Sequence, residues 1–229
     1  MTEQQRPYAL IMKKGSVESL ALKSSLALKL PSTMLKSASA STEIKHSRQD
    51  ILKTIQAASK PTDILLATTG YTGRELYALE DRDNQLYMVG SMGCISSFGL
   101  GIALVCSKQR VVDGDGAVLM RMSALAIIGY ERPPNLLHIM LDNQCYESTG
   151  GQSTISNSID FIAIAVACGY EKVIQANTLQ EVQTVIASTT EQLTFVHVKI
   201  KPGIPDSLPR PKITPPEVAQ RLRQFMQNQ

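Results

Sequence analysis

The sequence contains no tryptophan, and aromatic residues make up only 5% of its 229 positions. Proteins that stack nucleic-acid bases need exposed aromatic rings, so this scarcity argues against nucleic-acid binding. No apolar run is long enough to span a membrane. The first residues also lack the charged segment and apolar stretch of a secretory signal. We therefore expect a cytoplasmic protein that binds neither nucleic acid nor membrane.

Cysteine is also scarce, and its spacing carries no signal. Cys94, Cys106, Cys145 and Cys168 form no CxxC pair and no zinc-binding pattern. We interpret them as scattered reduced thiols.

Charge is distributed unevenly along the chain. The net charge is +3, of which residues 1–45 contribute +4 and the remainder −1. We interpret residues 1–45 as a short strand at 7–13 followed by a flexible basic linker, with room for a short helix at 18–30. Residues 46–229 are expected to form the folded domain.

That domain shows a regular alternation of short apolar runs and helical patterns. Strands are expected at 64–68, 86–89, 110–112, 136–141, 172–174 and 194–200. Helices are expected from 48 to about 59 and at 73–80, 97–106, 117–129, 159–168, 179–189 and 215–227. Residues with capping-box chemistry open three of them, at Ser47, Thr178 and Thr214. The alternation predicts an α/β fold of three layers, α/β/α, around a mainly parallel six-stranded sheet.

Polar residues follow two of these strands. Gly114-Asp115-Gly116 comes after the strand at 110–112, and Asn143, 28 positions beyond Asp115, comes after the strand at 136–141. Both should lie at the carboxyl edge of the sheet, where α/β proteins bind ligands. A carboxylate and an amide oxygen suit Mg²⁺, and glycines beside a helix start let a diphosphate approach the backbone. The pattern predicts a magnesium diphosphate site.

Two other motifs have a partial match in the sequence. An EF-hand beginning at Asp113 would need Glu at its twelfth position, which is Ala124. A dinucleotide fingerprint at Gly99-Leu100-Gly101 lacks the third glycine, at Leu104. Both interpretations fail.

The GDG…N pattern resembles the thiamine diphosphate motif. A closer resemblance, to the phosphonopyruvate decarboxylase family, is carried by Gly90-Ser91-Met92-Gly93, Asp113-Gly114-Asp115-Gly116, Leu141-Asp142-Asn143 and Gly150-Gly151-Gln152. The related sulfopyruvate decarboxylases resemble much of the same sequence. The resemblance covers roughly residues 48–229, with a weaker match at 6–15, which would be the last strand of a pyrimidine-binding domain followed by the start of the linker. It implies the thiamin diphosphate-binding fold, with thiamine diphosphate and Mg²⁺ as cofactors.

The resemblance also implies roles for particular residues. The metal ligands would be Asp115, Asn143 and the backbone carbonyl of Cys145, and Met92 would be the wedge beneath the bent cofactor. The cofactor-binding set would be Thr69, Gly70, Ser91, Met92, Gly93, Gly114, Asp115, Gly116, Ala117, Asn143 and Tyr146.

Some residues keep two interpretations. Thr69-Gly70 is either a diphosphate loop or an ordinary glycine turn. Residues 148–152 look like an active-site flap. Arg74 and Arg121 either meet an anionic substrate or lie on the surface, and His46, His138 and His197 are taken as structural.

One component of such enzymes is missing from the sequence. They need a second, pyrimidine-binding domain with a Glu that activates the cofactor, and Glu3, Glu18 and Glu43 lie outside any motif for it. We therefore expect a carboxy-lyase inactive without a pyrimidine-binding partner chain, within a hetero- or homo-oligomer. The substrate would be a small 2-oxo acid, phosphonopyruvate first. A sulfopyruvate decarboxylase β-type subunit and a non-catalytic cofactor-binding remnant remain alternatives.

Overall fold

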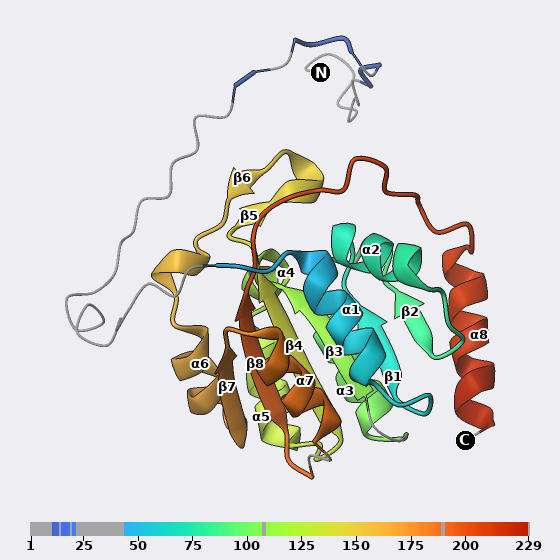
Figure 1. The fold of residues 1–229 in the computed structure, drawn as a ribbon, viewed down its shortest axis with the longest axis vertical. Helices are drawn as coiled ribbons and strands as arrows, with labels where there is room; N and C mark the ends of the chain where they lie inside the picture. Colours follow the sequence, from blue (N-terminus) through green and yellow to red (C-terminus); the bar gives the residue numbers. More distant parts are fainter. Residues whose placement is uncertain are drawn as a thin grey trace, which may run out of the picture.

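A parallel sheet forms the centre of the fold (Figure 1). The structure is a computed structural model that describes residues 11–13, 15–18, 20–21, 44–106, 109–188 and 191–228. Six strands pair in the order β2-β1-β3-β4-β8-β7, and every pairing is parallel. The strands are β1 (Ile64–Ala67), β2 (Gln85–Tyr87), β3 (Gln109–Gly114), β4 (Leu136–Asp142), β7 (Lys172–Ala176) and β8 (Thr194–Lys199). The predicted parallel six-stranded sheet is confirmed.

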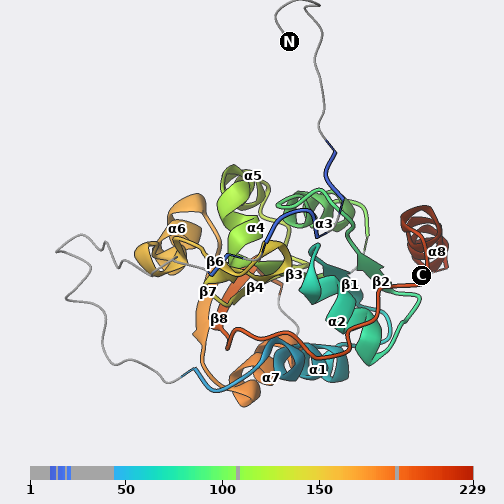
Figure 2. The same ribbon diagram turned by 90° about the horizontal axis from the view of Figure 1, so that it is seen from above.

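Helices cover both faces of this sheet, which gives the predicted three layers (Figure 2). The helices on one face are α1 (Arg48–Ala58), α2 (Tyr71–Leu79) and α7 (Leu179–Ala187). Those on the other are α3 (Ile95–Ala103), α5 (Ser123–Glu131) and α6 (Phe161–Cys168). The last helix, α8 (Pro215–Gln227), lies beside the edge strand β2, and the short α4 (Asp115–Met120) follows β3 directly.

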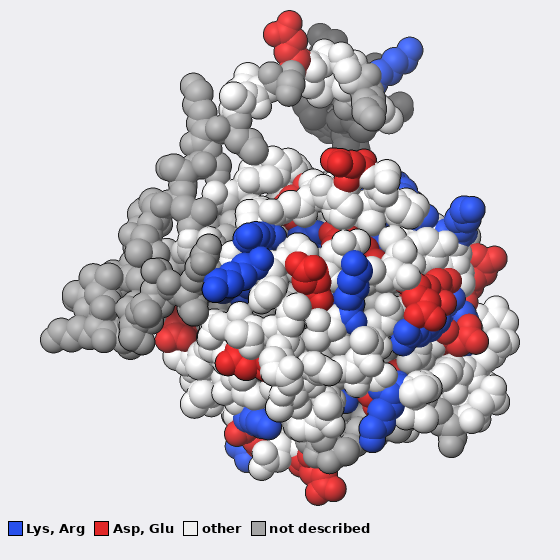
Figure 3. Space-filling model, viewed as in Figure 1, with Lys and Arg blue, Asp and Glu red and all other residues white. Residues whose placement is uncertain are grey.

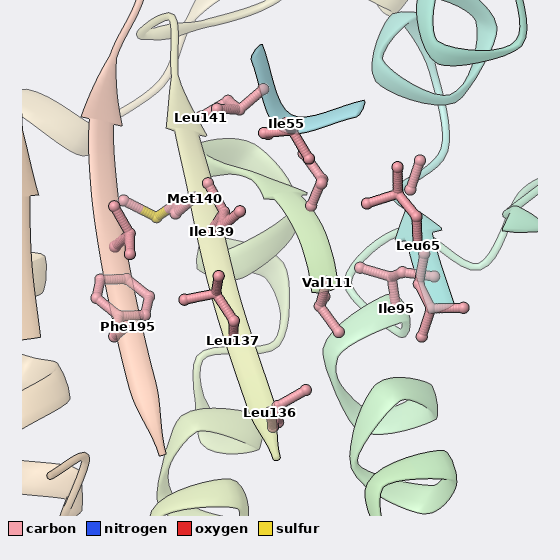
Figure 4. Packing of buried hydrophobic residues seen from close by; sticks show 14 of the residues in the cluster. Ile55, Leu65, Ile95, Val111, Leu136, Leu137, Ile139, Met140, Leu141 and Phe195 are labelled. Atoms are coloured by element: carbon pink, nitrogen blue, oxygen red, sulfur yellow. The ribbon is translucent and has the colours of Figure 1, made fainter. Parts of the chain in front are cut away.

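The core lies between these layers. All seven residues of β4 are buried, as expected for a central strand covered on both faces. Figure 4 shows side chains such as Leu137 and Ile139 of β4 beside Phe195 of β8 and Val111 of β3. The rigid sheet fixes where its carboxyl edge presents polar residues.

The three predicted capping boxes are present. Ser47, Thr178 and Thr214 each pair with an acidic residue three positions later, at the starts of α1, α7 and α8. Each box satisfies backbone N–H groups that a helix start would otherwise leave without partners.

The single helix predicted over 117–129 is wrong. The structure has α4 and α5 instead, separated at Arg121, whose backbone leaves the helical region at φ −135° and ψ 52°. Apolar spacing continues across this break, so periodicity alone does not reveal it. The structure also contains elements that were not predicted from the sequence. They are two short strands, β5 (Cys145–Tyr146) and β6 (Gln152–Ser153), and two 3₁₀ turns at Glu147–Thr149 and Ser156–Ser158.

The beginning of the chain is only partly described. Residues 11–13 adopt no strand, and residues 18, 20 and 21 adopt no helix. The rest of the strand expected at 7–13, most of the helix expected at 18–30 and most of the basic linker lie outside the described residues.

The surface has two notable features. Basic and acidic side chains are interspersed on the face shown in Figure 3. Large apolar side chains on or next to α3, α5 and α6 are exposed; this exposed apolar set is Phe98, Leu104, Val105, Met120, Ile127, Tyr130 and Val166. None of the helices in the described part of the chain is both long and apolar enough to cross a membrane.

Candidate functional site

A cleft of about 70 Å³ lies at the carboxyl edge of the sheet, where β1, β3 and β4 end. The residues that line it come from these strand ends, from the starts of α1, α2 and α4, from the turn that carries Met92, and from the loop around β5. They are Arg48, Thr68, Thr69, Gly70, Tyr71, Thr72, Met92, Gly114, Asp115, Gly116, Ala117, Leu141, Asn143, Cys145, Tyr146, Glu147 and Ser148. The predicted metal ligands therefore line one cleft together.

Asp115 occupies the first position of α4, immediately after β3 ends at Gly114. The helix begins there and not at Ala117 as predicted, so Asp115 is held by helical backbone. Its side chain accepts a hydrogen bond from Thr154 Oγ1 at 2.6 Å. Burial, and secondarily the neighbouring Asp142 carboxylate, raise the pKa of Asp115 to about 7. A cation at this carboxylate would relieve that penalty.

The turn after β4 presents Asn143 to the cleft. Asp142 is fully buried, accepts a hydrogen bond from the Gln144 backbone N–H at 3.1 Å, and lies 3.0 Å from His197 Nε2. Gln144 has a positive φ of 62°, which turns the chain sharply. The Asn143 amide oxygen receives only a long contact of 3.4 Å from the Cys145 N–H. Its acceptor capacity is thus largely available.

Glycine is required at position 116 by a close approach. A Cβ there would lie 2.5 Å from Cε1 of Tyr146 and 3.2 Å from Cε of Met92. A Cβ at Gly114 would meet nothing closer than 4.0 Å. Gly116 therefore lets the Tyr146 ring and the Met92 methyl pack against α4, whereas a Cβ at Gly114 would make only ordinary van der Waals contacts.

The Gly90–Gly93 turn places Met92 in the cleft. Gly90, Ser91 and Gly93 all have positive φ, and a Cβ on Gly93 would lie 2.8 Å from the Ala117 carbonyl oxygen. Of the predicted residues here, Met92 lines the cleft and Ser91 and Gly93 do not. Ser91 and Gly93 shape the turn that carries Met92.

The end of β1 forms another wall. Thr69 and Gly70 line the cleft, and Gly70 has a φ of 91° as it leads into α2. The buried Thr68 Oγ1 finds no hydrogen-bond partner among the described residues. A buried hydroxyl without a partner is costly, so an acceptor such as a phosphate oxygen would suit this position.

These observations fit a diphosphate held through a hard metal ion. Asp115 supplies one buried carboxylate, Asn143 an amide oxygen with a single long contact, and Thr68 an unused donor. In the described residues, no three His, Cys, Asp or Glu side chains gather to hold a metal. Mg²⁺ needs no such cluster, because phosphate oxygens and water complete its octahedron.

The sequence placed Glu147 in the loop that closes on the cofactor, but it did not indicate Arg48 or Thr154. Arg48 and Glu147 line it as an ion pair, and Thr154 contacts Asp115. No local pattern signals the Arg48–Glu147 pair, because 99 positions separate its members. Arg74 donates to the Leu208 carbonyl at 2.6 Å and Arg121 to Cys94 Sγ at 2.9 Å, and neither lines the cleft.

Two of the three histidines have structural partners. His138 Nδ1 lies 3.0 Å from the Tyr170 hydroxyl and its Nε2 lies 3.5 Å from Asp113 Oδ2. His197 pairs with Asp142 as described above. All five side chains of these pairs are buried.

A family model described as the thiamine pyrophosphate enzyme, C-terminal TPP binding domain, matches residues 70–200. A phosphonopyruvate decarboxylase of Streptomyces viridochromogenes is 47% identical over 173 residues, which cover 74% of this chain and 44% of the relative. A sulfopyruvate decarboxylase subunit beta of Methanothermobacter thermautotrophicus is 38% identical over 162 residues, covering 68% of this chain and 86% of the relative. The chain thus spans less than half of the phosphonopyruvate relative and most of the β subunit.

Solved structures agree on the fold. A putative thiamin diphosphate-dependent enzyme from Mycobacterium smegmatis superposes with a TM-score of 0.59 at 15% identity, covering 69% of this chain and 32% of that one. A benzoylformate decarboxylase from Polynucleobacter necessarius superposes with a TM-score of 0.58 at 17% identity, covering 70% of this chain and 35% of that one. At these identities the likeness extends to the fold alone.

Proposed function

This chain belongs to the thiamine pyrophosphate enzymes, whose C-terminal TPP-binding domain it carries, and we propose that it is the diphosphate-binding half of a 2-oxo acid decarboxylase. The reaction we propose converts phosphonopyruvate to phosphonoacetaldehyde and CO₂, as the names of two relatives at 47% and 45% identity suggest. The observation that carries the proposal is the meeting of Asp115 and Asn143 in one cleft at the ends of β3 and β4.

The residues of this cleft would divide the task of holding the cofactor. The Asp115 carboxylate, the Asn143 amide oxygen and the Cys145 backbone carbonyl would hold Mg²⁺. The backbone at Gly114 and the Thr68 hydroxyl would face the diphosphate. These contacts bind and orient, and they leave the reacting ring to other groups.

Thiamine diphosphate, when bound, supplies the carbon nucleophile and the electron sink that allow a 2-oxo acid to lose CO₂. Met92 would support the rings from below, because a flexible apolar side chain fits between two flat surfaces. Tyr146 packs against Gly116 and would help exclude water from the cleft.

The group that activates the cofactor is proposed to come from a pyrimidine-binding partner chain. The acidic side chains that line the cleft are Asp115 and Glu147, and Glu147 is already paired with Arg48. The cleft of about 70 Å³ is also far smaller than the roughly 300–1,000 Å³ of complete ligand sites. A positioned acid–base group typically contributes about 10²–10⁴-fold, so its absence would leave this chain inactive alone.

A second candidate is the β-type subunit of a sulfopyruvate decarboxylase. The observation that favours it is the match itself, because the chain is 38% identical to one such subunit over 86% of that subunit. A subunit of this kind would need a separate partner in the same way.

The test combines binding and turnover. The full chain is titrated with thiamine diphosphate in the presence of Mg²⁺, and is then assayed for aldehyde release from phosphonopyruvate and from sulfopyruvate. Both assays are run alone and with the pyrimidine-binding chain that co-purifies from the native source. We expect no turnover alone and turnover with the partner, on one substrate by preference. Binding without turnover in any combination would support the non-catalytic remnant, and robust turnover by the chain alone would refute the divided site.

A further inference from the structure

Three segments far apart in the sequence meet beside the cleft, where the start of α1, the loop after β5 and the segment after β8 lie together (Figure 1). Arg48, the first residue of α1, places its guanidinium between two carboxylates. Nη1 donates to Glu75 Oε1 on α2 at 2.5 Å, and Nη2 donates to Glu147 Oε2. The second oxygen of Glu147 accepts the backbone N–H of Gly203. We call these four residues the Arg48 network.

The network is buried, which makes it energetically important. The side chains of Arg48, Glu75 and Glu147 are only 6%, 1% and 8% exposed. Removing one member of a buried, hydrogen-bonded ion pair costs far more than breaking an exposed pair, because the remaining charge is left without compensation. Burial raises the pKa of Glu75, with the Arg48 guanidinium opposing this rise.

The backbone on one side of the network is fixed. The capping box of Ser47 and Asp50 holds the first turn of α1, and the Lys201 N–H donates to the His46 carbonyl oxygen at 2.8 Å. Ser47 also forms an isolated parallel bridge with Lys201. Arg48 therefore projects from a rigid support.

The other side of the network carries residues of the proposed cofactor site. Glu147 directly follows Tyr146, whose ring closes on Gly116, and it lies two residues after Cys145. The strands β5 and β6 that flank this turn pair at only two residues each. So short a hairpin is marginal by itself, and its position depends on such anchors.

We propose that Arg48 is a positioning residue that acts through Glu147 and docks the loop 145–153 over the cleft. The pair keeps Tyr146 against α4 and holds the Cys145 carbonyl at the cleft. The Gly203 N–H binds Glu147, and Lys201, two residues earlier, pairs with Ser47. The loop is therefore also connected to the segment that leads into α1. The inference deepens the proposed function, because it assigns the element that holds two of the proposed cofactor contacts in place.

The test measures the rate of amide hydrogen exchange of residues 145–153 in the full chain, which reports how firmly the loop is held. Glu147→Gln keeps the shape of the side chain but removes its charge, and we expect exchange in this loop to accelerate about 10-fold or more. Arg48→Lys should give a smaller acceleration, because the ammonium group keeps the positive charge but does not reproduce the two N–H donors that the guanidinium directs at Glu75 and Glu147. Arg82→Met, which breaks the Arg82–Glu80 pair with side chains 35% and 58% exposed, is the control and should leave the loop unchanged.

The same variants are titrated with thiamine diphosphate and Mg²⁺. We expect Glu147→Gln to weaken binding about 10-fold, in step with the loss of loop protection. Unchanged exchange in 145–153 for both Glu147→Gln and Arg48→Lys would overturn the positioning role, whatever happens to the melting temperature. If the unaltered chain binds no thiamine diphosphate, the proposed function fails, and the exchange experiment still decides the role of Arg48.

Discussion

Replacing Asp115 by Asn should stabilise the metal-free chain. The carboxylate is 2% exposed, and burial together with Asp142 raises its pKa from an ordinary 3.8 to about 7. That difference corresponds to about 4 kcal/mol at about 1.4 kcal/mol per pH unit, as an upper bound on the cost of the charge. Asn has the same shape, carries no charge, and can still accept the hydrogen bond from Thr154. We expect a gain of about 2 kcal/mol in the free energy of unfolding at pH 8.

The pH dependence of this gain follows from the direction of the pKa shift. Between about pH 4 and pH 7 the folded state holds a proton at Asp115 that the unfolded state has lost. The free energy of unfolding of the unaltered chain therefore falls as pH rises through this window, and that of Asp115→Asn lacks this contribution. The two proteins should be alike near pH 4 and should differ fully above pH 7.

Urea unfolding followed by circular dichroism, in a metal chelator at pH 5 and pH 8, measures this effect. The m-values should agree, so that a shift in midpoint reports stability. Asp83→Asn, at a side chain 81% exposed, is the control and should change stability by less than about 0.5 kcal/mol. A variant less stable than the unaltered chain at pH 8 would refute the reasoning.

Adding Mg²⁺ and thiamine diphosphate should reverse the order of the two proteins. At a ligand concentration 100 times Kd, binding stabilises the unaltered chain by about 2.7 kcal/mol. Asp115→Asn should gain much less, because a neutral amide is a weaker ligand than a carboxylate. Equal stabilisation of both proteins would remove Asp115 from the metal site.

Three further outcomes are expected. Gly129→Ala should lower the free energy of unfolding by about 3 kcal/mol or more, because its Cβ would lie 1.8 Å from the Cys168 carbonyl oxygen. In Gly101→Ala the Cβ meets nothing within 4 Å, so this variant should raise the free energy of unfolding by up to about 1 kcal/mol; thermal unfolding measures both. Hydrogen bonds from Ser47 lower the pKa of Asp50, and those from Asn177 and Thr178 lower the pKa of Glu181. The stability these capping acids contribute is present above about pH 4.5 and is lost as pH falls below it, so Asp50→Asn/Glu181→Gln should flatten the acid side of a melting-temperature profile. The exposed apolar set should make the isolated chain self-associate at micromolar concentration, which analytical sedimentation measures. A co-purified partner that covers the exposed apolar set should suppress this self-association.

The fold could be predicted from the sequence because its signals are local and strong. Buried parallel strands appear as short apolar runs, and β4 is buried at all seven positions. Capping boxes mark the starts of α1, α7 and α8. The placement of Asp115 and Asn143 at one edge followed from topology, because parallel strands end on the same side of the sheet.

The parts that were missed have no local signal. The break at Arg121 interrupts the backbone without interrupting the apolar spacing of α4 and α5. The strands β5 and β6 have two residues each, too few to show alternation. Arg48 was interpreted only as a residue of a helix start, because its partner Glu147 is distant in sequence and nearby only in the fold.

The buried acids of this protein give a further argument for a cation at Asp115. Among the residues that the structure describes, four aspartates are buried. Three of them face a basic side chain: Asp63 with Arg110, Asp113 with His138, and Asp142 with His197. Asp115 faces a hydroxyl and backbone N–H groups instead, and its pKa is raised to about 7, first by burial and then by Asp142. This fold places a basic side chain near three of its buried carboxylates and none beside Asp115 in the cleft, and this difference supports the cation that we propose there.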